Sequence, residues 1–236
     1  FMPDVLDLQE YSLHMHQQFY PLIRRYGYRI AYEGEEPWNN TPIFYNPETV
    51  ELVDVNYVLY APSCWSNIGS KSYTSAVFRK KDTGRLFAVV NTHLWWKSEA
   101  AQPGSTYARA AQVRLMMAEA EVLKNKYGCT IFVTGDMNAY EDSLPIRQFI
   151  EGGYTPCYKA ATDATDNGNG HHICGPKDGY SRTSRRRSPD REKGAIDHCF
   201  IYNAQEGVAV KVFDCITARI TVKLTDHYPY LIDAAL

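Results

Sequence analysis

The feature that most constrains this chain is an ordered series of five polar clusters, three of which stand at the end of an apolar, strand-like run. In chain order the clusters are Leu8-Gln9-Glu10, Asn91-Thr92-His93-Leu94, Gly135-Asp136-Met137-Asn138, Ile196-Asp197-His198 and Thr225-Asp226-His227. Carboxylates, an amide and imidazoles delivered by strand ends are the groups that metal-assisted phosphoester hydrolysis needs. Each cluster is weak evidence alone, so the inference depends on the ordered set.

Length and composition favour one domain. The chain has 236 residues and 44% hydrophobic content, enough to bury one sizeable core, and β-rich domains of this length often form a single unit. We therefore expect a single, monomeric domain over residues 1–236. Residues 161–193 are polar and Gly-rich without periodicity, which predicts a loop or an insertion. No apolar stretch is long enough to span a membrane.

The six cysteines give little information about compartment. None falls in a C-x-x-C pair, which argues against a zinc ribbon or a thioredoxin-like motif. Cys129 and Cys199 lie in apolar strand-like runs, where buried free thiols are expected. An even count permits disulfides without showing any, so the localisation stays open.

Helical periodicity is clearest over residues 106–127, where apolar residues recur at spacings of three and four and Gly128 follows as a stop. The recurring residues are Ala108, Ala111, Leu115, Ala118 and Val122. Residues 14–26 also have helical character, and Ser143 could cap a short helix over 144–150.

Two pairs of apolar runs flank turn-forming residues and predict β-hairpins. One joins residues 41–45 to 50–55, and the other joins 73–79 to 86–94. Further strands are expected at 130–134, 196–202 and 208–213. Many strands with few helices predict an α+β fold, in which two packed, mainly antiparallel sheets carry helices on their outer faces.

The first polar clusters suit a metal and a phosphate. A hard cation such as Mg²⁺ prefers carboxylate or amide oxygens, and Glu10 is a candidate ligand, although an acid is also favoured at a helix start. If strand geometry continues past Asp136, Asn138 projects to the same side. The carboxylate would then activate water while the amide holds a phosphate oxygen. The same residues could form an ordinary turn.

The imidazoles could act on either side of that phosphate. His227 could donate to a phosphoryl oxygen, and Asp226 beside it could reach the metal or the water. Asp197 could pair with an imidazole and raise its basicity, because an acid within the apolar run 195–201 needs a partner. His93 would be a second donor, although a lone strand histidine is more often part of a packed core.

In their order these motifs resemble the endonuclease/exonuclease/phosphatase superfamily, which includes pancreatic-type deoxyribonucleases, abasic-site endonucleases, inositol polyphosphate 5-phosphatases and bacterial sphingomyelinases. The matching segments span nearly the whole chain and are 3–10, 40–45, 89–94, 133–138, 196–198 and 225–229. As a set they are specific to the superfamily and say little about the substrate. The resemblance implies a four-layer α/β/β/α sandwich.

The resemblance also implies a Mg²⁺ site, at which Mn²⁺ is an alternative ion, with Glu10 as the principal ligand and Asp226 assisting. Members begin with a core strand whose Asn also helps at the metal, and nothing before Phe1 supplies it. We therefore expect a missing first strand and weakened metal binding and activity without it. Two smaller departures are His198, where the family usually has Tyr, and Thr225, where it has Ser.

The catalytic roles are likewise carried over from the family by position. Asp136 would activate or position the attacking water, and Asn138 would bind phosphate. His227, oriented by Asp197, would stabilise the pentacovalent phosphorane. His93 would be the second imidazole of the site.

The substrate class stays open at the level of sequence. Basic residues 182–193 could grip phosphate or form a solvated loop, and Trp95-Trp96-Lys97 could stack on a base or sugar or cover core. The net charge of −2 favours a small phosphorylated molecule or phosphodiester over DNA or RNA. The alternatives are a nuclease and a catalytically silent binding domain. The intact polar set argues against the silent domain.

Overall fold

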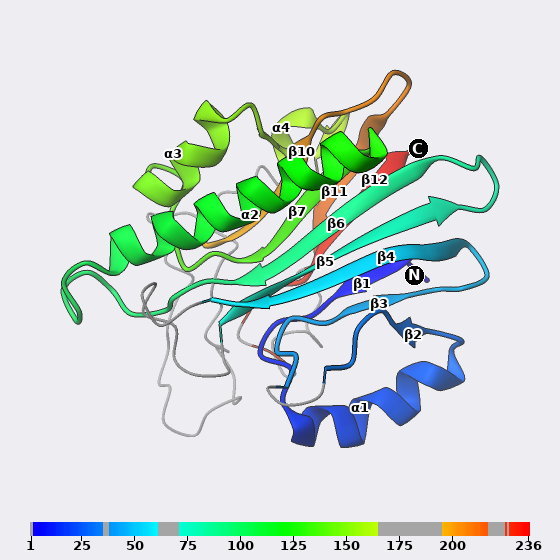
Figure 1. Ribbon diagram of the computed structural model, residues 1–236, viewed down its shortest axis with the longest axis horizontal. Helices are drawn as coiled ribbons and strands as arrows, with labels where there is room; N and C mark the ends of the chain where they lie inside the picture. The colour runs from blue at the N-terminus through cyan, green and yellow to red at the C-terminus, as the bar shows by residue number, and fades with distance from the viewer. Residues whose placement is uncertain (1, 35–37, 61–70, 165–194, 217–224, 226) are drawn as a thin grey trace.

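A six-stranded sheet forms the centre of the computed structural model, which describes residues 2–34, 38–60, 71–164, 195–216, 225 and 227–236 (Figure 1). The strand order is β4-β5-β6-β7-β10-β8. The strands are β4 (Val50–Leu59), β5 (Ser72–Lys80), β6 (Leu86–His93), β7 (Thr130–Asp136), β8 (Thr155–Pro156) and β10 (Asp197–Tyr202). Neighbouring strands are antiparallel except for β6 and β7, which run parallel.

Two three-stranded sheets pack on one face of this central sheet. The first, in the order β1-β3-β2, is antiparallel, and the second has the order β12-β11-β9. Their strands are β1 (Val5–Asp7), β2 (Arg29–Ile30), β3 (Ile43–Tyr45), β9 (Asp163–Ala164), β11 (Ala209–Cys215) and β12 (Tyr230–Ala235). Ile43 of the first sheet and Phe213 of the second join Phe78 of the central sheet in one apolar cluster.

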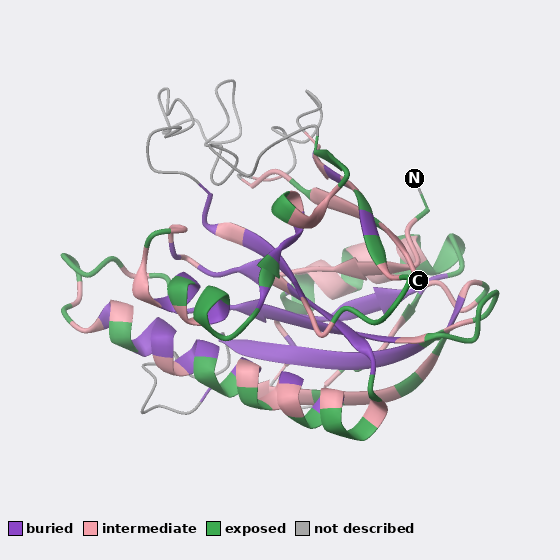
Figure 2. Cartoon of the chain, turned by 90° about the horizontal axis from the view of Figure 1, so that it is seen from above, coloured by how far each residue is buried: buried purple, intermediate pink, exposed green. Residues whose placement is uncertain are grey.

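Helices cover both outer faces. On the central sheet lie α2 (Ser105–Tyr127) and α3 (Leu144–Glu151), whose Met116 and Phe149 pack with Val90. On the β1-β3-β2 sheet lies α1 (Leu13–Arg25), and the short α4 (Cys157–Ala160) follows β8. Figure 2 shows buried strands between helices that are only partly buried. The layers are helix, sheet, sheet and helix, so the predicted fold class is confirmed.

The predicted hairpin between residues 41–45 and 50–55 is wrong. β3 pairs with β1 and β2, whereas β4 pairs with β5. A turn does form, because the backbone N–H groups of Thr49 and Val50 donate to Asn46 O. This turn carries the chain from one sheet layer to the other. Turn-forming residues fix where a chain reverses, and burial then decides which strands pair.

The helix predicted over residues 106–127 is confirmed, but only part of its recurring apolar series faces the core. Leu115 and Val122 are 41% and 56% exposed, whereas Met116 is fully buried. The true inner stripe includes Arg109 and Gln112, which hydrogen-bond the backbone of the segment after β6. Buried polar residues with backbone partners break the apolar periodicity on which a sequence prediction depends.

The remaining predictions concern smaller features. The hairpin of 73–79 with 86–94 forms as β5 and β6. Ser143 stands at the N-cap of α3, but its hydroxyl donates to Tyr140 O instead of capping the helix. The predicted buried thiols of Cys129 and Cys199 are confirmed. None of the described helices is long and apolar enough to cross a membrane. Most of the predicted loop at 161–193 lies outside the described residues.

Candidate active site

Strand register places three of the predicted residues in a row. His93 at the end of β6 pairs in register with Asp136 at the end of the parallel strand β7. Asp197 at the start of the antiparallel strand β10 pairs with the same Asp136. Adjacent strands lie about 4.8 Å apart, so side chains from three distant segments meet at one sheet edge.

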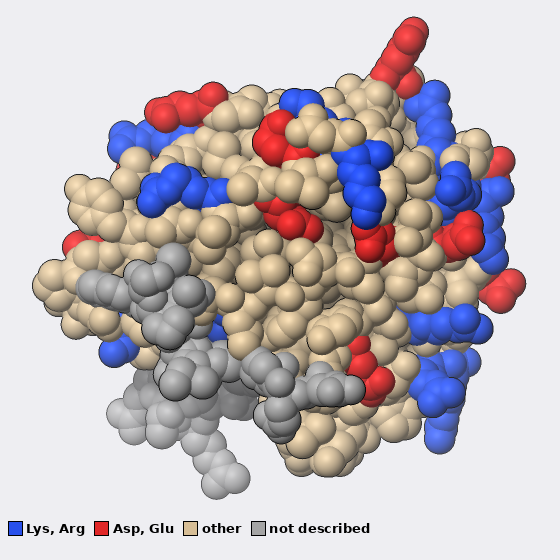
Figure 3. Space-filling model, in the orientation of Figure 1, with Lys and Arg blue, Asp and Glu red and all other residues tan. Residues whose placement is uncertain are grey.

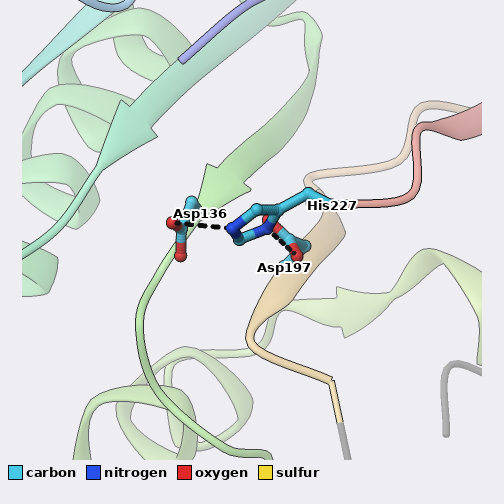
Figure 4. Close-up of side chains that lie close together, drawn as sticks. All are labelled: Asp136, Asp197 and His227. Atoms are coloured by element: carbon cyan, nitrogen blue, oxygen red, sulfur yellow. Dashed lines mark hydrogen bonds and ion pairs between the residues drawn. The ribbon is translucent and has the colours of Figure 1, made fainter. Parts of the chain in front are cut away.

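Asp136, Asp197 and His227 form a compact cluster at this edge (Figure 4). His227 Nδ1 lies 2.8 Å from Asp197 Oδ2, and its Nε2 lies 4.0 Å from Asp136 Oδ2. A carboxylate at Nδ1 assigns the proton of a neutral ring to that nitrogen and turns Nε2 toward Asp136. The structure thus brings together a carboxylate, an oriented imidazole and a second carboxylate. Asp226 itself lies outside the described residues.

The environment of Asp136 changes its acidity. The side chain is 10% exposed, and its Oδ1 accepts a hydrogen bond of 2.9 Å from the backbone N–H of Asn138. Burial and then the charge of Asp197 raise the pKa of Asp136 to about 7, while His227, the Asn138 N–H and Lys71 act in the opposite direction. A carboxyl group that titrates near neutral pH can act as a general base or acid.

The segment Gly135-Asp136-Met137-Asn138 is both a strand end and a turn. The strand stops at Asp136, and Asn138 adopts a left-handed φ of 47°, so the assumption that strand geometry continues is wrong. The Asn138 side chain donates to Leu94 O at 3.3 Å. Gly135 has a φ of 139°, and a Cβ at this position would collide with the Thr92 backbone. Only glycine permits this close approach of β6 and β7.

Glu10 approaches the row from the second sheet layer. It follows β1 with a left-handed φ of 56°, its side chain is 81% exposed, and its Oε1 lies 4.0 Å from His93 Nε2. Asn91 holds this segment in place, since it donates to Leu8 O at 2.8 Å and accepts from Gln9 Nε2 at 2.7 Å. Asn91 and Gln9 lie within the polar sequence motifs, but the motifs alone predict no role for either residue.

The two departures from the family pattern differ in position. His198 follows Asp197 on β10 and therefore points to the opposite face of the sheet. There its ring stacks on Phe200, and its Nε2 lies 2.7 Å from Ala139 O. Thr225 lies beside the site, where its hydroxyl oxygen accepts from the backbone N–H of His227 at 3.1 Å. The serine-to-threonine change thus keeps a hydroxyl that orders the His227 segment.

Lys71 is a site residue that the sequence reasoning missed. The residue is 4% exposed, and its Nζ lies 2.6 Å from Nε2 of His93. The signal was available in the predicted hairpin, because extending its register pairs Ser72 with His93. Residue 71 comes directly before that pair, so the register brings its backbone to the end of β6, and the structure shows its side chain turned to the imidazole.

Trp95 and Trp96, which follow β6, differ in exposure, and this bears on whether each covers core or could stack on a base or sugar. Trp95 is 6% exposed and donates from its indole to Ser105 Oγ, so it covers core. Trp96 is 57% exposed, and the Lys97 ammonium lies 5.7 Å from the centre of its ring. The basic residues at 182–193 lie outside the described residues.

The residues present suit a divalent cation. Asp136, Asp197 and His227 each offer one ligand atom, and these atoms lie within 4.8 Å of one another. Glu10 adds an exposed carboxylate on the other side of His93. The charge of Asp197 raises the pKa of Asp136, which means that the described acids repel one another and that a cation would relieve the repulsion.

Sequence comparison gives one partial match. No protein-family model matches the chain. The chain is similar to the RNA exonuclease NGL1 of Saccharomyces cerevisiae, with 31% identity over 83 residues. The matched segment covers 31% of this chain and only 21% of that protein's length.

Structural comparison covers nearly the whole chain. An endonuclease/exonuclease/phosphatase from Bacteroides vulgatus superposes with a TM-score of 0.72 at 21% identity, over 99% of this chain and 85% of that one. The mannosyl-6-phosphatase Bt3783 of Bacteroides thetaiotaomicron gives 0.71 at 17% identity, over 99% and 85%. The human Nocturnin catalytic domain with bound sulfate gives 0.70 at 19% identity, over 99% and 81%. The chain therefore has the fold of the endonuclease/exonuclease/phosphatase superfamily, as its ordered motifs predicted.

Proposed function

We propose that this chain is a divalent-metal-dependent phosphoesterase that hydrolyses a phosphoester bond by in-line attack of water. The observation that supports this most directly is the row of His93, Asp136 and Asp197 across three strand ends, with His227 held between the two carboxylates. The shared fold adds support, because similar structures include a protein named as a phosphatase and another named as an endonuclease/exonuclease/phosphatase.

In this proposal Asp136 accepts the proton of the attacking water while the water oxygen forms the new bond to phosphorus. Its pKa of about 7 suits proton transfer near neutral pH. The bond from phosphorus to the leaving oxygen breaks on the opposite side. His227 acts in its cationic form, which the Asp197 carboxylate stabilises, and donates from Nε2–H to a phosphoryl oxygen. The Asn138 amide binds another of the phosphoryl oxygens. Because Asp136 and His227 act on the water and the phosphate in this proposal, Glu10 and Asp226 would hold Mg²⁺ or Mn²⁺, which would supply a positive charge next to a phosphoryl oxygen.

We propose a small phosphorylated molecule or phosphodiester as the substrate. The chain carries a formal net charge of −2, and acidic and basic side chains of the described residues are interspersed on the face drawn in Figure 3. Such a surface does not concentrate a polyanion.

A nuclease is the second candidate, because Trp96 is exposed close to the site with Lys97 over its ring. An exposed aromatic ring beside a cation can stack on a base. The partial similarity to an RNA exonuclease supports the same candidate.

The test is a panel of phosphate monoesters, phosphodiesters, plasmid DNA and single-stranded RNA, each assayed with Mg²⁺, with Mn²⁺ and with excess chelator. We expect chelator-sensitive hydrolysis of at least one class. Asp136→Asn should lower kcat by about 10³-fold or more, since it removes the base without changing the side-chain shape. The matched control is Asp82→Asn in the exposed β5–β6 turn, which should leave the rate unchanged. Full activity of Asp136→Asn would refute the proposal.

A further inference from the structure

Lys71 is a buried cation in the candidate site that the proposed mechanism leaves without a role. It immediately precedes β5, is 4% exposed and contacts His93 through Nζ. A buried ammonium is costly unless nearby groups compensate its charge. Burial lowers the pKa of Lys71 to about 8, and the charges of Asp136 and Glu10 act in the opposite direction. These two acids thus compensate the charge of the Lys71 ammonium.

The contact with Lys71 fixes the state of His93. An ammonium can only donate hydrogen bonds, so Nε2 of His93 accepts from Lys71 at 2.6 Å, and the ring proton lies on Nδ1. Nδ1 is buried and has no hydrogen-bond partner among the described residues. The contact thus makes His93 an acceptor whose Nε2 is already occupied by the Lys71 ammonium.

Asp136 lies between this pair and His227. Its Oδ2 is 3.3 Å from His93 Nε2 and 4.0 Å from His227 Nε2. A phosphoryl group in front of Asp136 therefore has the His227 imidazole on one side and the Lys71 ammonium on the other. Negative charge spreads over the phosphoryl oxygens in the transition state, and a fixed cation beside them stabilises it.

We propose that Lys71 is a catalytic residue that binds a phosphoryl oxygen on the side opposite His227, and that His93 is a positioning residue that holds the Lys71 ammonium in place. This inference rests on the proposed function, because it requires a phosphoester substrate. It reassigns the second donor of the site from the imidazole of His93 to the ammonium behind it.

The first experiment compares Lys71→Met, Lys71→Arg and the surface control Lys81→Met. Each variant is assayed for hydrolysis on the panel above and for binding of inorganic phosphate by isothermal titration. Lys71→Met should lower kcat/KM by about 10²–10³-fold and weaken phosphate binding at least about tenfold, as expected for loss of one charged contact to an oxyanion. Lys71→Arg should retain most of the phosphate affinity, which also keeps the test valid if Lys71→Met fails to fold.

The second experiment separates positioning from direct contact. His93→Gln can still accept a hydrogen bond from Lys71 through its amide oxygen, whereas His93→Leu cannot. We expect phosphate affinity to stay within about threefold of wild type in His93→Gln and to fall about tenfold in His93→Leu. The two variants differ in this way because only Gln keeps an acceptor that holds the Lys71 ammonium in place.

The outcomes distinguish this inference from the proposed function. Wild-type hydrolysis and phosphate binding in Lys71→Met would overturn the role of Lys71 while leaving the phosphoesterase proposal in place. Loss of phosphate binding in Lys71→Met, in a chain that hydrolyses nothing on the panel, would support a phosphate site and count against the phosphoesterase. Tighter Mn²⁺ binding with unchanged hydrolysis in Lys71→Met would show that Lys71 only neutralises the neighbouring acids, and would also overturn the inference.

Discussion

The two sides of the site each contain one imidazole, and the two differ in burial and in partner. His227 side-chain exposure is 27%, and its partner is the carboxylate of Asp197. His93 is 2% exposed, and its partner is the ammonium of Lys71. A carboxylate neighbour stabilises a cationic imidazole, whereas an ammonium neighbour and burial both oppose it.

This difference teaches that the residue type alone does not assign a catalytic role. Two histidines 4.0 Å or less from the same Asp136 oxygen face opposite electrostatic environments. On the His227 side the imidazole itself can present a proton to the substrate. On the His93 side the available protons belong to Lys71. The site is therefore asymmetric, although each of its two sides contains a histidine.

The largest expected effect that separates the two sides is the loss of His227. His227→Gln should lower kcat by about 10³-fold and Asp197→Asn by about 10²-fold, because an imidazole and the carboxylate that orients it act as one unit. The double variant should be no more than about threefold worse than His227→Gln, since coupled residues are non-additive. By contrast, His93→Gln should stay within about tenfold of wild type. Losses that multiply in the double variant would contradict the pairing of Asp197 with His227.

A smaller effect concerns pH and tests the carboxylate that the two sides share. Asp136 must be deprotonated to accept a proton, and its pKa is raised to about 7. In the metal-free chain the Asp136 carboxyl should therefore be half deprotonated near pH 7, and its ¹³C chemical shift should report this titration. A bound cation, by relieving the repulsion from Asp197, should move the midpoint, and with it the rise of activity, to lower pH. A metal-free midpoint below pH 5 would show that Asp136 is an ordinary carboxylate.

The smallest expected effect on activity comes from a buried acid outside the site. The Asp7 residue is partly buried, and its Oδ2 accepts a hydrogen bond of 2.6 Å from the Thr134 hydroxyl. Its Oδ1 is fully buried and has no hydrogen-bond partner among the described residues. Burial raises the pKa of Asp7 from 3.8 to about 6. The folded chain thus holds this proton more tightly than the unfolded chain does. The contribution of Asp7 to stability should be greatest below about pH 4 and fall as the pH rises from about 4 to about 6.

Asp7→Asn removes the loss of stability that deprotonation of Asp7 causes, because an amide does not titrate. A pKa difference of about 2 corresponds to about 3 kcal/mol, so the variant should gain on the order of 1–3 kcal/mol in unfolding free energy at pH 8. Its catalytic rate should change little, in contrast to every site variant above. Urea denaturation at pH 4 and pH 8, with Asp82→Asn as the exposed control, checks both parts. An unchanged pH dependence in Asp7→Asn would mean that another group titrates.

Part of the site could be predicted from sequence because its groups stand at recognisable strand ends. The apolar runs before Asp136 and His93 locate the ends of β7 and β6, and parallel neighbours end at the same sheet edge. Gly135 belongs to the same local information, since its backbone meets that of Thr92. Lys71 belongs to none of the polar motifs, and strand register brings only its backbone close to His93, so motifs alone do not predict its contact with the imidazole.

The sequence alone determined the element types, the fold class and the ordered set of acids, amide and imidazoles. These follow from periodicity and turn chemistry, which act over a few residues. Only the tertiary structure decided that β3 pairs with β1 and β2 and that α2 buries Met116 rather than Leu115. It also decided that the Lys71 ammonium contacts Nε2 of His93. Each of these depends on which segment, distant in the chain, completes the packing and compensates the charge.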